Sequence, residues 1–227
     1  MATTRVDFYF DYLSPYAYLG WLQLRSLGEA RGLELRPDPV ALGGLLKHWG
    51  QLGPAEIPPK ALFTFKDCVR RAQRLGCAFR APAFHPFNPL TALRVSLEEV
   101  AGSAQLAVVD ALWQASWASG RDVGSAEVIR EVLDEIGLDG ARLVARASEP
   151  VVKERLKTNA SRAIELGVFG VPTTFVDGEL FWGADQMDWI AARLDGKDPL
   201  DQVSLSDIAP QGTGQHRKRA AATTPQS

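Results

Sequence analysis

Ser14 and the proline after it are the residues whose types and spacing most clearly indicate chemistry. Before them, the apolar residues Val6, Phe8 and Phe10 alternate with polar ones, as in a strand. Serine followed by proline is typical of a helix start, with serine as N-cap and proline at the first helical position. The predicted arrangement brings a hydroxyl to a helix N-terminus, where backbone N–H groups favour an anion. A purely structural role for Ser14, as a cap, is the alternative.

The chemistry open to this hydroxyl depends on its partners. A serine is a weak nucleophile without a nearby base, and none of the three histidines is tied to Ser14 by a hydrolase pattern. We therefore do not expect a Ser-His-Asp hydrolase. At a helix start the hydroxyl can instead donate a hydrogen bond to a thiolate that another molecule supplies.

The two cysteines, Cys68 and Cys77, are nine residues apart, and the chain contains no C-x-x-C motif. Free cysteine is among the most buried residue types, so we predict unpaired thiols with packing roles. Disulfide exchange through a dithiol is not expected.

The elements that must position Ser14 begin with a βαβ unit: strand 6–10, helix 15–31 and an extended run 33–40. Two prolines in that run place it at a sheet edge or in a turn. Residues 60–75, 89–101, 105–118, 126–136 and 151–166 have helical apolar spacing. Short β runs at 173–176 and 179–181 then flank Asp177-Gly178, a hairpin signal, and a last helix covers 188–194.

The composition is that of an ordinary globular protein, with 46% hydrophobic and 23% charged residues. The net charge of −2 gives no indication of nucleic acid or an acidic membrane as partner. No signal-like or membrane-spanning apolar run is visible, so we expect a cytoplasmic protein without a membrane partner. We expect no metal ion.

Two stretches together resemble a known family. FDYLSPYAYLG at 10–20 and GVFGVPTTFVDGELFWGADQMDWI at 167–190 are similar to the 2-hydroxychromene-2-carboxylate isomerases and kappa-class glutathione transferases, within the DsbA-like superfamily. The resemblance runs over residues 6–194. It implies an α/β, thioredoxin-like fold with an inserted all-helical subdomain. Residues 1–41 and 161–201 would form the thioredoxin-like domain, 42–160 the insertion and 202–227 a disordered tail.

The resemblance also implies a glutathione site. Ser14 matches the serine that binds and activates the glutathione thiol. Val171 would pair its backbone with the cysteinyl backbone of glutathione, before a cis Pro172. Trp182, Gly183, Ala184 and Asp185 match the stretch that receives the γ-glutamyl end. There Asp185 would accept from the ammonium and helix-start N–H groups would take the carboxylate; capping of the last helix is the alternative for Asp185.

Further positions match less closely. Gln51 stands where relatives often have Asn, and Ala184 where Asn or Ser is common. Lys60 matches a lysine that reaches the ligand, so it could bind the glycine carboxylate or a substrate carboxylate, although a solvated surface charge is the alternative. His85 and Asn88 lie in a loop that resembles part of the isomerase substrate wall, or they form a turn.

Aromatic residues near these loops favour an apolar second site for a small aromatic carboxylate. They are Tyr16, Trp49, Phe169 and Trp182. The function implied is a glutathione-dependent isomerase of 2-hydroxychromene-2-carboxylate or a related aromatic-degradation intermediate, acting by reversible thiolate addition. A kappa-like glutathione transferase and a non-catalytic thiol- or peptide-binding module are the alternatives. Relatives are typically homodimers, which we also expect here.

Overall fold

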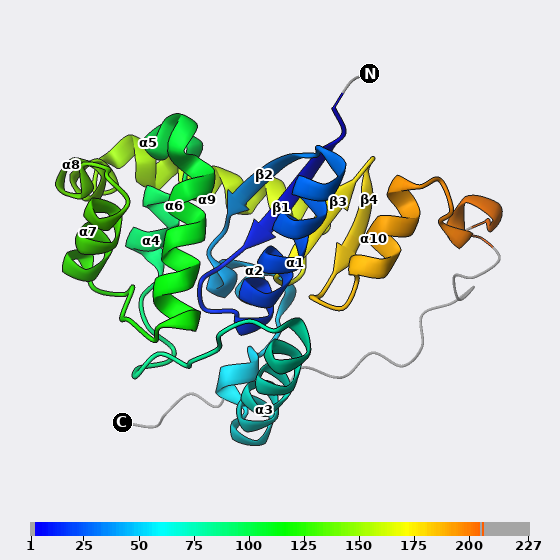
Figure 1. Ribbon diagram of the computed structural model, residues 1–227, viewed down its shortest axis with the longest axis horizontal. Coiled ribbons are helices and arrows are strands. Elements are labelled where there is room, and N and C mark those ends of the chain that lie inside the picture. Colours follow the sequence, from blue (N-terminus) through cyan, green and yellow to red (C-terminus); the bar gives the residue numbers. More distant parts are fainter. Residues whose placement is uncertain (1–2, 205, 207–227) are drawn as a thin grey trace, which may run out of the picture.

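The structure, a computed structural model, describes residues 3–204 and residue 206. Figure 1 shows a twisted sheet at the centre, with helices packed around it. The strands are β1 (Arg5–Phe10), β2 (Glu34–Pro39), β3 (Thr173–Val176) and β4 (Glu179–Trp182), in the order β2-β1-β3-β4. β1 pairs in parallel with β2, and β3 is antiparallel to both β1 and β4. The predicted α/β, thioredoxin-like fold is therefore confirmed.

β1 is buried on both faces because helices pack against each side of the sheet. Val6, Phe8 and Phe10 join the main hydrophobic core with helix α1 (Pro15–Arg31). Tyr9 points to the opposite face and joins a smaller core with Leu45 of helix α2 (Leu42–Trp49). The predicted alternation of β1 is confirmed, although both sets of side chains are buried.

Proline and glycine positions agree with the local predictions. β2 is an edge strand, so the missing N–H groups of Pro37 and Pro39 remove no ladder bond inside the sheet. Asp177 and Gly178 have φ of 49° and 80°, as a two-residue hairpin turn requires.

Helices fill the chain between β2 and β3. Figure 1 shows α4 to α8 gathered on one side of the sheet and α3 below it. They are α2, the 3-10 turn η1 (Pro54–Glu56), α3 (Pro58–Leu75), α4 (Leu90–Val95), α5 (Glu98–Ala101), the 3-10 turn η2 (Gly102–Ala104), α6 (Gln105–Trp113), the π-helix η3 (Gln114–Ala118), α7 (Ala126–Glu135), α8 (Gly140–Arg146) and α9 (Pro150–Glu165).

The main core continues from the sheet into these helices. Trp113 of α6 packs on Phe10 and Tyr12, with ring centroids 5.6 Å and 4.5 Å apart. Helix α9 runs through residue 160 without a break. The division into a thioredoxin-like domain and an insertion stays an interpretation of this continuous core.

Two predicted helices differ in detail. The helix expected at 89–101 is broken, because Leu97 is extended (ψ 139°) and α5 starts after it. Ser96 Oγ donates to the Ala92 carbonyl and bonds the Tyr12 hydroxyl, so a side chain competes with the helix backbone there. The helix expected at 105–118 changes to a π-helix after Trp113.

Helices α2 and α8 were not predicted as separate elements. Two glycines weaken the apolar pattern of α2. Helix α8 has only 7 residues, too few for a clear apolar pattern, and Asp139 is its N-cap. The chain continues through α10 (Met187–Leu194) and the 3-10 turn η4 (Pro199–Gln202). Apart from residues 202–204 and 206, the expected tail lies outside the described residues. No helix in the described part has the length and apolar character needed to cross a membrane.

Candidate functional site

Ser14 caps α1 as predicted and lies close to the loop before β3. Its Oγ accepts from the Ala17 N–H at 3.2 Å, and Pro15 is the first helical residue. The same Oγ donates to the Val171 carbonyl over a long 3.4 Å. Ser14 is 8% exposed, so its hydroxyl lies in a largely dry position at the positive end of a helix.

Hydrogen bonds of Asp11 fix the loop that carries Ser14. One carboxylate oxygen accepts from the Leu13 N–H at 3.0 Å, and the other accepts from the Leu42 N–H at 2.8 Å. The Asp11 carbonyl accepts from the Ser14 N–H at 3.0 Å. Burial raises the pKa of Asp11 to about 6, while the two N–H groups oppose the rise. Asp11 therefore joins the start of α1 to the start of α2.

The Val171–Pro172 peptide bond is cis, as the family resemblance implies. Gly20 of α1 lies against it: a Cβ at Gly20 would be 3.3 Å from Pro172 Cγ. The Pro172 carbonyl accepts from the Gly183 N–H at 3.0 Å. The loop before β3, the start of α1 and the end of β4 therefore meet at one place.

The residues after β4 extend this place. Gly183 has φ of 116°, and Ala184 is buried, with its carbonyl accepting from Gln23 Nε2 at 3.0 Å. Asp185 is exposed and makes no hydrogen bond or ion pair within the described residues. The N-cap of α10 is Gln186, so the structure gives Asp185 no capping role.

Three of the predicted aromatic residues form one side of the site. The rings of Phe169 and Trp182 pack with centroids 5.0 Å apart. Trp49 Nε1 donates to the Val168 carbonyl at 2.9 Å, which brings α2 to the same loop. Trp49 and Trp182 remain 43% and 52% exposed. They leave an apolar, solvent-facing surface beside Val171.

His85 and Asn88 have different positions. His85 Nε2 lies 2.9 Å from the Leu13 carbonyl, the distance of a donated hydrogen bond, and its ring packs edge-on to Trp117. His85 thus supports the Ser14 loop. Asn88 Oδ1 accepts from the Leu90 N–H at 3.1 Å and so forms the turn before α4. No hydrogen bond in the described part joins the Asn88 side chain to the site.

Gln51 and Lys60 are exposed, near the two ends of η1. Within the described residues, neither side chain has a hydrogen bond or ion pair that links it to the Ser14 loop. Their predicted contacts with a ligand stay predictions.

Sequence reasoning missed a polar network beside the site. The Tyr16 hydroxyl donates to Asp67 Oδ2 at 2.9 Å, and Arg71 Nε donates to the same oxygen at 2.6 Å. Although partial burial pushes the pKa of Asp67 upward, these two hydrogen bonds hold it below its ordinary value. The only signal was an i,i+4 pair of opposite charges, which is common on helix surfaces.

Both cysteines are unpaired, as predicted. Cys68 is buried, and burial raises the pKa of its thiol to about 12. It packs in the core as a neutral thiol.

Comparisons with known proteins identify the family of this chain. The DSBA-like thioredoxin domain family matches residues 5–195. The 2-hydroxychromene-2-carboxylate isomerase of Pseudomonas putida is 30% identical over 192 residues, which cover 83% of this chain and 93% of that protein. Glutathione S-transferase kappa 1 of Rattus norvegicus is 26% identical over 210 residues, covering 85% and 91%. A solved structure of 2-hydroxychromene-2-carboxylate isomerase has a TM-score of 0.78, with 27% identity over 91% of this chain and 100% of that one.

Proposed function

The chain belongs to the DSBA-like thioredoxin domain family, and within it we propose a glutathione-dependent isomerase. Its substrate would be 2-hydroxychromene-2-carboxylate or a related aromatic-degradation intermediate. The observation that carries the proposal is a serine hydroxyl, in place of a thiol, at the start of α1 and beside the cis Val171–Pro172 bond. Relatives named as this isomerase support the choice of reaction.

The start of α1 fits the thiol of glutathione. As a donor within the described residues, the Ser14 hydroxyl makes only a long bond, to the Val171 carbonyl, so it could turn to donate to a sulfur. The Val171 N–H has no acceptor within the described residues, and it lies just before the ladder of β3. The N–H and the carbonyl of Val171 would pair with the backbone of a bound peptide, as an added strand does. A relative named glutathione S-transferase kappa supports the choice of thiol.

The ends of glutathione would bind on either side of Ser14. Asp185, whose carboxylate has no partner in the described part, would accept from the γ-glutamyl ammonium. Gly183 and Ala184 would offer backbone groups beside it, next to Trp182. Lys60 and Gln51 would serve the glycine end.

The substrate would lie on the aromatic side of the site. The surface of Trp49, Phe169 and Trp182 would pack on a fused ring. His85 would act mainly through the Leu13 carbonyl, by holding the Ser14 loop.

The residues of this chain would act on charge and position. When bound, glutathione would supply a thiolate that adds reversibly to the conjugated double bond of the ring-opened substrate, which permits rotation before it leaves again. Ser14 Oγ would donate a hydrogen bond to the sulfur, and the N-terminus of α1 would stabilise its negative charge. The buried position of Ser14 excludes water and strengthens both effects.

A kappa-like transferase is the second candidate, because kappa transferases match the chain over a similar length. The two reactions differ in what happens to glutathione. Interconversion of 2-hydroxychromene-2-carboxylate and its trans ring-opened isomer, followed by absorbance while free thiol is titrated, separates them. An isomerase requires glutathione and consumes none. Thiol loss in step with product formation would identify a transferase. If neither isomerisation nor thiol loss is observed, the remaining candidate is a non-catalytic binding module.

Assembly and location stay predictions. We propose a homodimer in the cytoplasm, by analogy with the relatives. Sedimentation of the purified protein and fractionation of cells would test these two points.

A further inference from the structure

Arg71 of α3 is held in place beside the N-terminal turn of α1. Its Nε donates to Asp67 Oδ2, the oxygen that also accepts from the Tyr16 hydroxyl. The guanidinium carbon lies 5.5 Å from the centre of the Tyr16 ring, as in a cation–π contact. Because Tyr16 is two residues after Ser14, this network holds a cation against the first turn of α1, the helix that begins at the candidate thiol site.

The outer edge of this guanidinium is open. The Arg71 side chain is 35% exposed, and within the described residues its two terminal nitrogens have no hydrogen-bond acceptor. Asp185, in the loop after β4, is exposed, carries the opposite charge and has no ion-pair partner within the described residues. Although partial burial lowers it, the pKa of Arg71 is raised by the hydrogen bond to Asp67 and by the charges of Asp67 and Asp185. The loop that carries Asp185 also lies against α1, because Ala184 Cα is 3.7 Å from a Cβ built at Gly20, and α3 packs on the same helix.

We propose that Arg71 binds the α-carboxylate at the γ-glutamyl end of glutathione, whose ammonium the proposed function already assigns to Asp185. Arg71 would bind the carboxylate with its two terminal nitrogens, and Asp185 would bind the ammonium. This inference rests on the proposed function and deepens it. It assigns the carboxylate to a side chain of α3, in addition to the N–H groups at the start of α10.

The arrangement suits a zwitterion better than a simple anion. A ligand with only a negative group would be attracted by Arg71 and repelled by Asp185. Because Asp67 and Tyr16 already hold Arg71, binding orders few new rotamers, which lowers its entropic cost. The competing explanation is that Arg71 only braces α3 against α1.

Calorimetric titration with three thiols separates these explanations. Glutathione carries both charged groups, 4-aminobutanoyl-Cys-Gly lacks the α-carboxylate, and glutaryl-Cys-Gly lacks the ammonium. Arg71→Met should weaken glutathione binding by about 10- to 100-fold and change the Kd of 4-aminobutanoyl-Cys-Gly little. Asp185→Asn should weaken glutathione binding while changing the Kd of glutaryl-Cys-Gly little.

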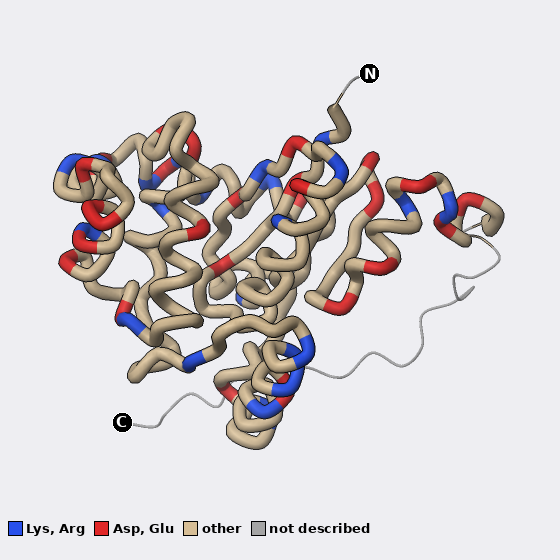
Figure 2. Tube along the Cα trace, viewed as in Figure 1, with Lys and Arg blue, Asp and Glu red and all other residues tan. Residues whose placement is uncertain are grey.

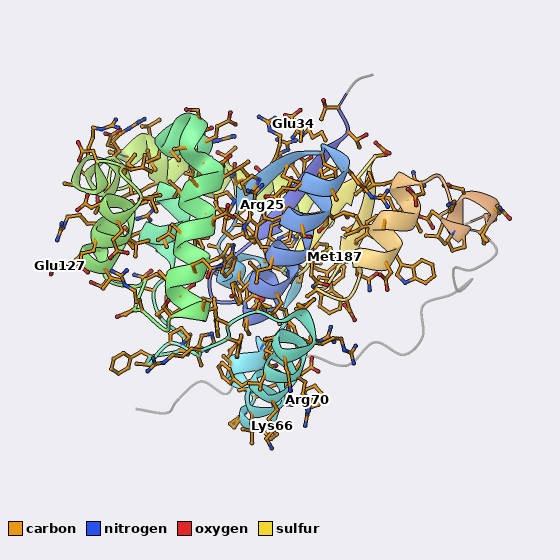
Figure 3. All side chains as sticks on the ribbon, in the orientation of Figure 1. Arg25, Glu34, Lys66, Arg70, Glu127 and Met187 are labelled. Carbon is orange, nitrogen blue, oxygen red and sulfur yellow. The ribbon has the colours of Figure 1, made fainter. Side chains whose placement is uncertain are left out.

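Arg70→Met is the matched control, because it removes the same charge from the same turn of α3. Figure 2 shows basic residues along this helix, and Figure 3 labels Lys66 and Arg70 on its side away from the sheet. Arg70→Met should leave the three Kd values nearly unchanged.

Equal weakening of all three thiols by Arg71→Met would overturn the inference in favour of the bracing role, and so would no weakening at all. If Arg71→Met does not fold, Arg71→Lys is the deciding variant. It keeps the positive charge but lacks the two terminal guanidinium nitrogens, so it should still reduce the preference for glutathione over 4-aminobutanoyl-Cys-Gly. Wild-type protein that binds glutathione without that preference would refute this inference alone. Wild-type protein that binds none of the thiols would refute the proposed function as well.

Discussion

The substitution Asp11→Asn tests what the buried carboxylate beneath the Ser14 loop does to stability. Asp11 is fully buried, and within the described residues its two carboxylate oxygens accept only from the N–H groups of Leu13 and Leu42. Burial raises its pKa to about 6, against an ordinary value of 3.8. That difference corresponds to about 3 kcal/mol between the neutral and the charged carboxyl group.

The sign of the effect follows from the direction of this shift. Because the pKa of Asp11 is higher in the folded protein, the folded state binds more protons than the unfolded state between about pH 4 and about pH 6. The free energy of unfolding therefore falls by up to about 3 kcal/mol from this group as pH rises through that window. Asparagine is uncharged at every pH and resembles the neutral carboxyl group, so the variant escapes this loss.

Urea unfolding of both proteins, followed by tryptophan fluorescence from about pH 4 to about pH 8, measures the difference. The stability of Asp11→Asn relative to wild type should rise with pH and level off above about pH 6. Asp38→Asn should show the same sign, because burial and the charge of Asp7 raise the pKa of Asp38 to about 6. A difference that stays constant with pH, or that falls as pH rises, would refute the reasoning.

Three further predictions concern the site and its surroundings. Gly20→Val should lower kcat/KM, because its added atoms would press on Pro172, 3.3 Å from a Cβ at that position; unchanged kinetics would argue against this contact. The double variant of Cys68 and Cys77 to alanine should lose ~1 kcal/mol of stability in urea unfolding and keep its turnover, whereas lost turnover in the folded variant would indicate thiol chemistry. Trp49→Ala should raise KM for the aromatic substrate by about 2- to 10-fold and leave the Kd of glutathione unchanged; equal effects on both ligands would place Trp49 in the glutathione site.

Local signals in the sequence predicted the elements that carry Ser14. The serine-proline pair specified the start of α1, and Asp177-Gly178 specified the hairpin of β3 and β4, because each depends on the backbone preferences of a few neighbouring residues. The cis bond before Pro172 came from the family resemblance, since trans is the ordinary expectation for any X–Pro bond.

Features that depend on tertiary contacts could not be predicted in this way. The break after Ser96 requires Tyr12, a residue more than eighty positions away, whose hydroxyl bonds the serine. Arg71 comes close to the start of α1 only because α3 packs against α1 and its partner Asp67 bonds Tyr16. Asn88 forms the turn before α4, which was one of its two predicted roles, and its contact with a substrate stays a prediction.

The central claim is that Ser14 stabilises the thiolate of bound glutathione. The pKa of the bound thiol, measured by ultraviolet absorbance of the thiolate during a pH titration, tests it most directly. In wild-type protein this pKa should lie below that of free glutathione. Ser14→Ala should raise it by about one to two units, because a hydrogen bond to a charged group contributes about 1.5–3 kcal/mol. The same thiol pKa in both proteins, with glutathione bound to each, would contradict the claim.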